Sequence, residues 1–196
     1  SSDCTTVSAD CQPFDLCPAN KHSEIVLSER TDIKNVNENR CGDMELGLKG
    51  LKLFITAGAS GIGRQIVESF LSEGADVSTC DIDNTALADL RAAHPSVLAH
   101  QCDVSNSSAI QALIKNTADE MGGLDCLVNN AGIAGPTARI EDIDDEAWHK
   151  CVNICLSSQF YCIKAALPYL RGSKNASIVN LSSAAGKFGF PLRSPY

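Results

Sequence analysis

From Met44 onward, short apolar runs alternate with longer segments whose apolar residues recur at helical spacing. We expect strands at residues 51–57, 76–82, 96–104, 124–132 and 176–186, and helices at 62–73, 84–93, 106–121 and 144–171. Near-continuous apolar strands that are separated by helices are typical of a parallel sheet covered on both faces. Right-handed crossovers then give a doubly wound α/β fold of three layers, α/β/α.

The charge balance excludes some classes of partner. The chain has 196 residues, a formal net charge of −8 and 44% hydrophobic residues, which suits one domain with a real core. An acidic chain lacks the basic face that binding to nucleic acid requires. No stretch approaches the ~18 uninterrupted apolar residues of a membrane span, so we expect neither nucleic acid nor membrane as a partner.

Residues 1–43 differ in character from the rest of the chain. They are polar, lack sustained periodicity and contain one short apolar patch, Ile25–Leu27. No apolar segment preceded by positive charge marks a secretory signal. We therefore expect a poorly ordered leader over 1–43 and a single nucleotide-binding domain over 44–196, whose first residue could be the true start of the functional protein.

The ten cysteines are expected to be mostly free thiols, because those beyond residue 44 fall in apolar runs or on one helix face (Cys80, Cys102, Cys126, Cys151, Cys155 and Cys162). Cross-links among Cys4, Cys11, Cys17 and Cys41 remain the alternative for the leader. No pair has C-x-x-C spacing and the four histidines are scattered, so we expect no metal site. Free thiols favour a reducing, cytoplasmic location.

A glycine cluster, "TAGASGIGR" at 56–64, lies between the first expected strand and its helix. Gly58, Gly61 and Gly63 have no Cβ atoms, so backbone N–H groups and the helix N-terminus can approach a pyrophosphate closely. Glycines also collect in plain turns, but this placement after a strand and before a helix favours a dinucleotide site. The pattern therefore predicts a Rossmann fold.

Acidic residues at the ends of the next two strands indicate which dinucleotide binds. Asp81 ends the second strand, where a carboxylate can accept hydrogen bonds from ribose hydroxyls and repel a 2′-phosphate. Ile82 follows it and Ser60 is uncharged, so no basic residue favours the phosphate. The charges therefore favour NAD over NADP. Asp103 can accept from the adenine amino group, with Val104 packing on the ring.

With these residues in place, the chain resembles the short-chain dehydrogenase/reductase family from Met44 to Tyr196. "TAGASGIG" is similar to the family's T-G-x-x-x-G-x-G loop, and so assigns Thr56, Ser60 and Ile62 to the cofactor site beside the glycines. Ala57 replaces the first glycine of that loop, and we expect it to fit with a negative φ.

Two further groups of residues carry the resemblance. "NNAG" at 129–132 matches the motif that steadies the sheet and borders the cofactor, which includes Asn130, Ala131 and Gly132. Asn153 matches the family's helix asparagine, and Ser183 and Tyr196, thirteen residues apart, match its catalytic serine and tyrosine.

The resemblance implies roles for these residues. An alcohol must lose a proton as its hydride leaves for nicotinamide. The family uses its tyrosine as general acid/base, and a lysine four residues later makes that phenol reactive. By resemblance Tyr196 is the acid/base, Ser183 hydrogen-bonds the reacting oxygen, and Asn153 holds the water and lysine of a proton relay.

The position of that lysine lies beyond Tyr196, as do a further helix and two strands that the resemblance implies. We therefore expect a fragment of a longer NAD-dependent oxidoreductase. The alternative is a truncated, non-catalytic dinucleotide-binding or interaction protein.

The expected substrate is a small alcohol or ketone. A 3-oxoacyl thioester, a sugar or polyol, a steroid and a cyclic ketone all remain open. Phe188, Phe190 and Leu192 suggest a partly apolar pocket, while Lys187 and Arg193 could meet a carboxylate or a phosphopantetheine. The expected helix 144–171 is apolar on more than one side, which indicates a homodimer or homotetramer or, alternatively, burial within one subunit.

Overall fold

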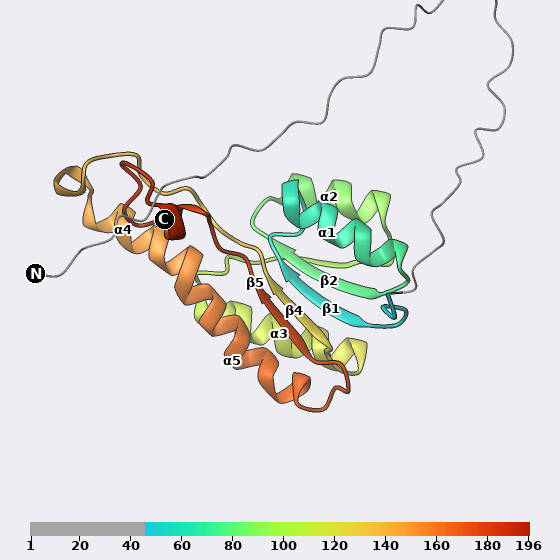
Figure 1. Ribbon diagram of the computed structural model, residues 1–196. Coiled ribbons are helices and arrows are strands. Elements are labelled where there is room, and N and C mark those ends of the chain that lie inside the picture. Colours follow the sequence, from blue (N-terminus) through green and yellow to red (C-terminus); the bar gives the residue numbers. More distant parts are fainter. Residues whose placement is uncertain (1–45) are drawn as a thin grey trace, which may run out of the picture. The chain divides into compact units, whose positions relative to one another are not determined.

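The computed structural model describes residues 46–196 (Figure 1). The expected leader, 1–43, and its four cysteines lie outside the described residues. The described residues form one parallel sheet with helices on both of its faces (Figure 1).

The sheet has five strands in the order β3-β2-β1-β4-β5. They are β1 (Lys52–Thr56), β2 (Asp76–Asp81), β3 (Leu98–Gln101), β4 (Cys126–Asn129) and β5 (Ser177–Asn180). Every pairing is parallel, with Leu53 opposite Val77 on one side and Cys126 on the other. The chain reverses its direction of travel across the sheet between β3 and β4, so a crevice opens where β1 and β4 end. The doubly wound Rossmann-type fold is confirmed.

The helices and helical turns are α1 (Gly61–Ser72), α2 (Asn84–Ala93), α3 (Ser107–Met121), η1 (Ile140–Asp142), α4 (Asp145–Val152), η2 (Asn153–Ser157), α5 (Ser158–Leu170) and α6 (Ala185–Phe188). The strands are shorter than the apolar runs that predicted them, because several of those runs continue into buried loop positions such as Cys102 and Val104.

Side-chain alternation along the central strands divides the core into two layers. Leu53 and Ile55 of β1 pack with residues of α1 and α2 on one face of the sheet. Phe54, which lies between them, packs with α3 and α5 on the other face. Because successive strand side chains point to opposite faces, a strand that is apolar throughout must be covered on both sides. This is the physical reason for the three layers.

The helix α3 begins at Ser107, one residue after the expected start at 106. The cap is Asn106, whose side chain accepts a hydrogen bond from Ala109 N at 3.1 Å. Ser105 instead donates both its N–H and its hydroxyl to Asp103 Oδ1, each at 2.8 Å. Because Ser105 is hydrogen-bonded to Asp103, the cap is formed by the next residue, Asn106.

The long helix expected over 144–171 is interrupted by the π-helical turn η2. Ser158 Oγ donates to Ile154 O at 2.6 Å inside this region, a side-chain bond that helps a wider turn form. The turn begins at Asn153, so the expected catalytic asparagine lies at an irregularity of the helix. Single-turn π insertions are frequent at functional sites.

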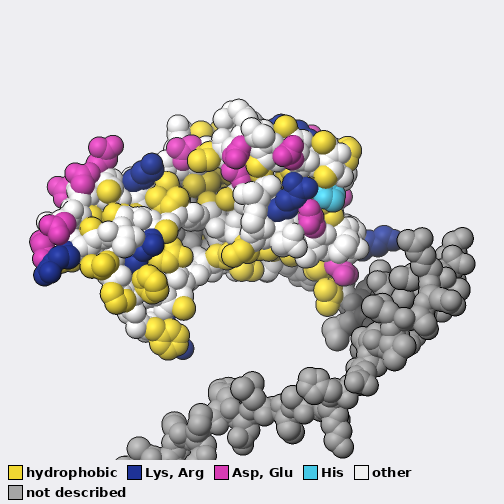
Figure 2. Space-filling view, turned by 90° about the horizontal axis from the view of Figure 1, so that it is seen from above, with side chains coloured by type: hydrophobic (Ala, Val, Ile, Leu, Met, Phe, Trp, Pro, Cys, Tyr) yellow, Lys and Arg dark blue, Asp and Glu magenta, His cyan; other side chains and the backbone are white. Residues whose placement is uncertain are grey.

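The strand β5 is exposed along its whole length and is bonded to β4 alone. Ile178 and Val179 expose 38% and 48% of their surface, and Leu156 and Phe160 on the neighbouring helix expose more than 60%. Figure 2 shows hydrophobic side chains gathered along the lower edge of the described part, with acidic side chains at its left end. Within residues 46–196 no helix has the length and apolar character needed to cross a membrane.

Candidate functional site

The expected site residues follow the carboxyl ends of the strands. Thr56 and Asp81 end β1 and β2, and Asn130 and Ser183 come shortly after β4 and β5. In an open parallel sheet these ends meet at one edge, on either side of the point where the strand order reverses. The fold therefore collects residues that are more than one hundred positions apart in the sequence.

One pocket of about 510 Å³, here called the central pocket, lies at this edge. It is lined by six of the expected site residues: Ile62, Asn130, Ala131, Gly132, Ser183 and Tyr196. Its other walls include Ile133, Ala134 and Pro195, which belong to the segments that the resemblance places on the substrate side. Sequence reasoning missed the remaining walls, which are Cys155, Leu156, Gln159, Asn180, Leu181 and Ser182. The catalytic serine and tyrosine of the resemblance therefore share one pocket with the N-A-G turn.

Two glycines of the loop are required by packing. A Cβ atom on Gly58 would collide with the Thr79 hydroxyl, and one on Gly63 would collide with the Ala57 carbonyl oxygen. Thr79 Oγ1 accepts a hydrogen bond from Gly58 N at 3.1 Å and donates to Ile55 O at 2.9 Å, so it fixes the loop to the sheet. No sequence pattern predicted this role of Thr79.

Gly61 serves a different purpose in the same loop. Its φ is +53°, in the left-handed region, and a Cβ atom there would meet nothing within 4 Å. Ser60 caps α1 without a side-chain hydrogen bond, so the first N–H groups of the helix have no side-chain partner there. An open glycine surface beside uncapped helical N–H groups fits a pyrophosphate.

Ala57 does not have the negative φ that we expected. Its φ is +54°, which places an alanine in the left-handed region that favours glycine. The reason is the tight geometry at the end of β1, where Gly58 N is bound by both Thr79 Oγ1 and Cys80 O. The loop keeps the backbone shape of a glycine position, and the Cβ atom of Ala57 is accommodated at a conformational cost.

Thr56 and Asn130 are occupied in bonds within the protein. The Thr56 hydroxyl accepts from Asn130 N at 3.0 Å and from Ala131 N at 2.9 Å. Asn130 Nδ2 donates to Thr56 O and Ala57 O, both at 3.0 Å. These four bonds join the glycine loop to the turn after β4, and so fix the walls of the crevice between β1 and β4.

Asp81 is held by backbone N–H groups on both carboxylate oxygens. Oδ2 accepts from Ala59 N and Oδ1 from Asp83 N, each at 3.2 Å. A carboxylate oxygen has more than one lone-pair site, so Asp81 can still accept from ribose hydroxyls. Ile82 next to it exposes 67% of its surface. The arrangement fixes one negative charge beside the glycine loop.

Asp103 and Val104 lie beyond β3, on the same side of β1 as Asp81. Asp103 is exposed and its Oδ1 accepts the two bonds from Ser105. Val104 is only 7% exposed and belongs to the core cluster of α3 and α5. A ring that packs on Val104 therefore meets only the small accessible part of this side chain.

Ser183 and Tyr196 have side-chain atoms available in the central pocket. Ser183 Oγ accepts a hydrogen bond from Ala185 N at 3.1 Å, which leaves its own hydroxyl hydrogen free to donate. Tyr196 exposes 45% of its surface. Both side chains therefore line the same pocket.

Asn153 is exposed and is not among the residues that line the central pocket. Its Oδ1 accepts from Ser157 Oγ at 3.3 Å across the π-helical turn. Gln159, one turn further on, does line the pocket, and its amide donates to Cys155 O at 2.9 Å and to Leu181 O at 3.3 Å. Gln159 thus links the irregular helix to the segment that carries Ser183.

The six cysteines of the described part are all free thiols. Cys151 and Cys155 lie beside the central pocket, with sulfur atoms 4.0 Å apart, and Cys155 Sγ contacts both Ile133 N and Ile133 O. Burial and the neighbouring Cys155 raise the pKa of the Cys151 thiol to about 11. Cys151 therefore stays a neutral, packed thiol at physiological pH.

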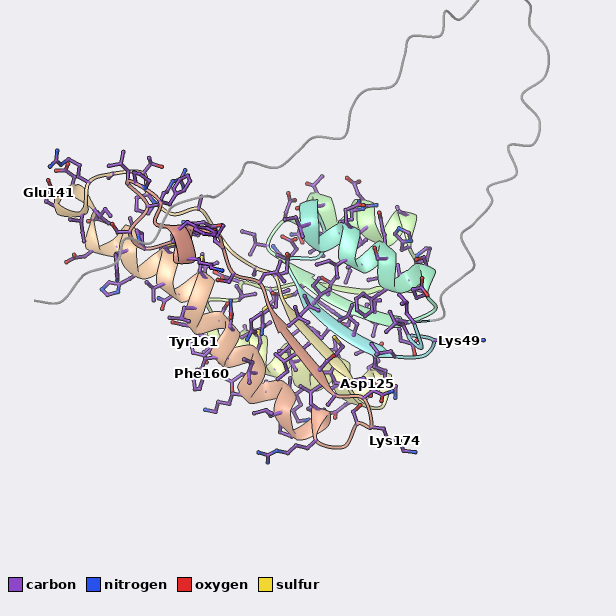
Figure 3. The ribbon with its side chains drawn as sticks, viewed as in Figure 1. Lys49, Asp125, Glu141, Phe160, Tyr161 and Lys174 are labelled. Atoms are coloured by element: carbon purple, nitrogen blue, oxygen red, sulfur yellow. The ribbon has the colours of Figure 1, made fainter. Side chains whose placement is uncertain are left out.

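A second pocket, of about 470 Å³, lies at the amino ends of the strands. Its lining includes Lys49, Asp125 and Lys174, which Figure 3 places at the end of the sheet away from Glu141. Asp125 accepts from Lys52 N and Ser173 Oγ, so its carboxylate is used for structure. None of the expected site residues lines this pocket.

Comparison with known proteins agrees with the fold. The family model described as short chain dehydrogenase matches residues 52–196. A 2-dehydro-3-deoxy-L-rhamnonate dehydrogenase (NAD(+)) of a Sphingomonas species is 34% identical over 142 residues, which cover 72% of this chain and 57% of that protein. A 3beta-hydroxysteroid dehydrogenase of Mediterraneibacter gnavus is 34% identical over 148 residues, covering 74% and 53%.

Among solved structures, a short chain dehydrogenase from Mycobacterium smegmatis is 38% identical, with a TM-score of 0.70. The match covers 76% of this chain and 64% of that one. The chain thus spans a little over half the length of the curated relatives that it matches.

Proposed function

Because the chain belongs to the short-chain dehydrogenase family, we propose that it is the nucleotide-binding and catalytic part of an NAD-dependent oxidoreductase. The reaction transfers a hydride between NAD(H) and the CH–OH or C=O group of a small alcohol or ketone. The observation that carries this proposal is the central pocket, where Ser183 and Tyr196 lie with the turn Asn130–Gly132.

The residues present fit a dinucleotide. Gly61 leaves open space, α1 offers N–H groups without a side-chain cap, and Asp81 places a carboxylate beside the loop. We assign Gly58 and Gly63 to the close packing of the loop, and Thr56 and Asn130 to the support of its far wall. The fixed charge of Asp81 favours NAD over NADP, because a 2′-phosphate would meet it.

In alcohol oxidation, the bound NAD⁺ supplies the hydride acceptor. The hydroxyl hydrogen of Ser183 donates to the substrate oxygen, while the Ser183 oxygen accepts from Ala185 N. The proton of the substrate hydroxyl passes to the deprotonated oxygen of Tyr196, which becomes the neutral phenol, and in carbonyl reduction that phenol returns the proton. Asn153, near the pocket but outside its lining, is assigned to the proton relay rather than to contact with the substrate.

The test is NADH formation by the longer protein to which we expect this chain to belong, assayed with a panel of secondary alcohols, sugars, hydroxy acids and hydroxysteroids. We expect turnover of at least one class, and we expect Ser183→Ala to lower kcat/KM by about 10²–10⁴-fold. Ser194→Ala is the matched control, because Ser194 is exposed and lines neither the central pocket nor the smaller pocket that adjoins it. Equal rates for Ser183→Ala and the unchanged chain would refute the assignment.

We also propose that the enzyme is a cytoplasmic homo-oligomer. The six free thiols of the described part suit a reducing compartment. Leu156 and Phe160 expose 66% and 62% of their surface on the helix beside the sheet, and Figure 3 shows Phe160 and Tyr161 on that helix. Light scattering of the chain and of Phe160→Ser tests this assignment. A monomer in both samples would contradict it.

A further inference from the structure

A smaller pocket adjoins the central pocket at the two catalytic hydroxyls. This side pocket of about 270 Å³ is lined by Ser183, Tyr196, Ala134, Phe190, Arg193 and the start of α6. It shares Ala134, Ser183 and Tyr196 with the central pocket. A substrate whose reacting oxygen lies between the two hydroxyls can therefore extend into the side pocket while its carbon faces the central pocket.

Arg193 is the cation of this side pocket, and one hydrogen bond fixes its head group. Nη1 donates to Ala134 O at 2.9 Å, on the loop that forms the shared wall. Nε is buried and has no hydrogen-bond partner among residues 46–196. Within the same residues no carboxylate lies in ion-pair range of Arg193. A ligand cannot reach this Nε, but Nη1 uses only one of its hydrogens in the bond to Ala134 O, and Nη2 makes no hydrogen bond within the same residues, so these two groups keep donors that a ligand can use.

The rest of the lining carries no charge. No aspartate or glutamate side chain lines the central pocket or the side pocket. Arg193, which lines the side pocket, is the one charged side chain in either lining. The charge of the pocket lining thus has the opposite sign to that of the whole chain, whose formal net charge is −8. A pocket with one cation and no carboxylate favours an anion over a neutral molecule of the same shape.

Resting on the proposed function, we propose that Arg193 determines specificity for substrates that carry a carboxylate, so that the substrate class is small hydroxy acids and the corresponding oxo acids. A guanidinium presents parallel N–H donors that match the two oxygens of a carboxylate. The side pocket, with about 270 Å³, is smaller than the central pocket, with about 510 Å³, which favours a short acid over a long one.

Lys187 provides the matched control. It belongs to the same segment, but its ammonium group lies 5.5 Å from the ring centre of Phe188 and it lines neither pocket. Removing its charge changes the net charge of the chain as much as removing that of Arg193 does. A general charge effect would therefore appear in both variants, and a specific site would appear only in the Arg193 variants.

The experiment is calorimetry on the chain saturated with NAD⁺. The probes are 2-hydroxybutyrate and 3-hydroxybutyrate, each compared with its neutral amide of nearly equal shape. We expect at least one acid to bind about tenfold or more tightly than its amide. Arg193→Gln should reduce this ratio to about one, Arg193→Lys should keep part of it, and Lys187→Gln should leave it unchanged.

The outcomes separate this inference from the proposed function. The role of Arg193 is overturned, and the dinucleotide site is not, if NAD⁺ binds saturably but the acid and the amide bind equally well or not at all. A preference for the acid that survives Arg193→Gln has the same meaning. Failure to bind NAD⁺ overturns both. Circular dichroism and thermal unfolding of each variant show whether Arg193→Gln is folded, and Arg193→Lys repeats the comparison with the cation retained.

Discussion

The glycine loop and the segment 181–196 face the same pocket, but they are built in opposite ways. In the loop, Thr56 and Gly58 are buried and bonded to neighbouring strands, and no space remains for a Cβ atom at Gly58 or Gly63. In the segment, Tyr196 is 45% exposed, and most of the backbone hydrogen bonds close local turns. The proposed nucleotide side is fixed by packing, whereas the proposed catalytic side is held mainly by local turns.

This difference separates two kinds of mutational effect. Where a residue is buried and bonded on all sides, a substitution changes the free energy of unfolding and the shape of the site together. Where a side chain projects into a pocket from an exposed turn, a substitution changes chemistry and leaves stability nearly unchanged.

Tyr196→Phe should give the largest effect, and only on catalysis. Loss of the hydroxyl removes the proton acceptor, so kcat should fall by about 10²–10⁴-fold. The free energy of unfolding should change by less than about 0.5 kcal/mol, because the side chain is 45% exposed. Steady-state kinetics and urea unfolding of the same preparation measure both quantities. A large loss of stability would break the comparison.

Gly63→Ala should damage the nucleotide side through packing. The Cβ atom of the new alanine would collide with Ala57 O and lie 2.6 Å from Asn130 Nδ2. We therefore expect the free energy of unfolding to fall by about 1–3 kcal/mol and NAD⁺ to bind more weakly. Gly186→Ala is the control in the catalytic segment, since a Cβ atom there meets nothing within 4 Å. Similar unfolding midpoints for the two variants would show that the loop is less constrained than we infer.

Ala57→Gly should stabilise the chain. The left-handed conformation of Ala57 costs about 1–2 kcal/mol, and part of this gain is offset by the greater freedom of glycine in the unfolded chain. We expect a net gain of about 0.5–1 kcal/mol in urea unfolding. Ala184→Gly, at an ordinary helical φ of −58°, should give no gain. If Ala57→Gly lost stability instead, the alanine would not be strained.

The smallest effect concerns pH and a histidine at the edge of the sheet. Burial, assisted by Arg91 and opposed by Glu120, lowers the pKa of His100, whose Nε2 is buried without a partner among residues 46–196. The unfolded chain then binds a proton more readily, so stability is full above pH ~6.5 and falls as the pH drops through the folded pKa.

His100→Gln should remove this acid sensitivity, which we expect to be less than about 1 kcal/mol. Unfolding free energies at pH 7.5 and pH 5.5 (about two units apart) measure it. The exposed His149 gives the control variant, His149→Gln. An equal drop for His100→Gln and the unchanged chain would contradict the assignment.

The sequence predicted what depends on periodicity and missed what depends on individual contacts. Alternating strands and helices predicted the doubly wound sheet, because β1 and β4 are apolar on both faces. It did not predict the left-handed Ala57, since only the contacts around Gly58 impose that conformation. It also missed the π-helical turn and the role of Gln159, which depend on side-chain bonds between distant segments.

The central claim is that the glycine loop and Asp81 form a site for NAD. Calorimetric titration of the chain with NAD⁺ and with NADP⁺ tests it most directly. We predict saturable binding of NAD⁺ with one site per chain, binding of NADP⁺ about tenfold weaker or more, and loss of that difference in Asp81→Asn. No binding of NAD⁺, or an equal affinity for both dinucleotides in the unchanged chain, would contradict the account.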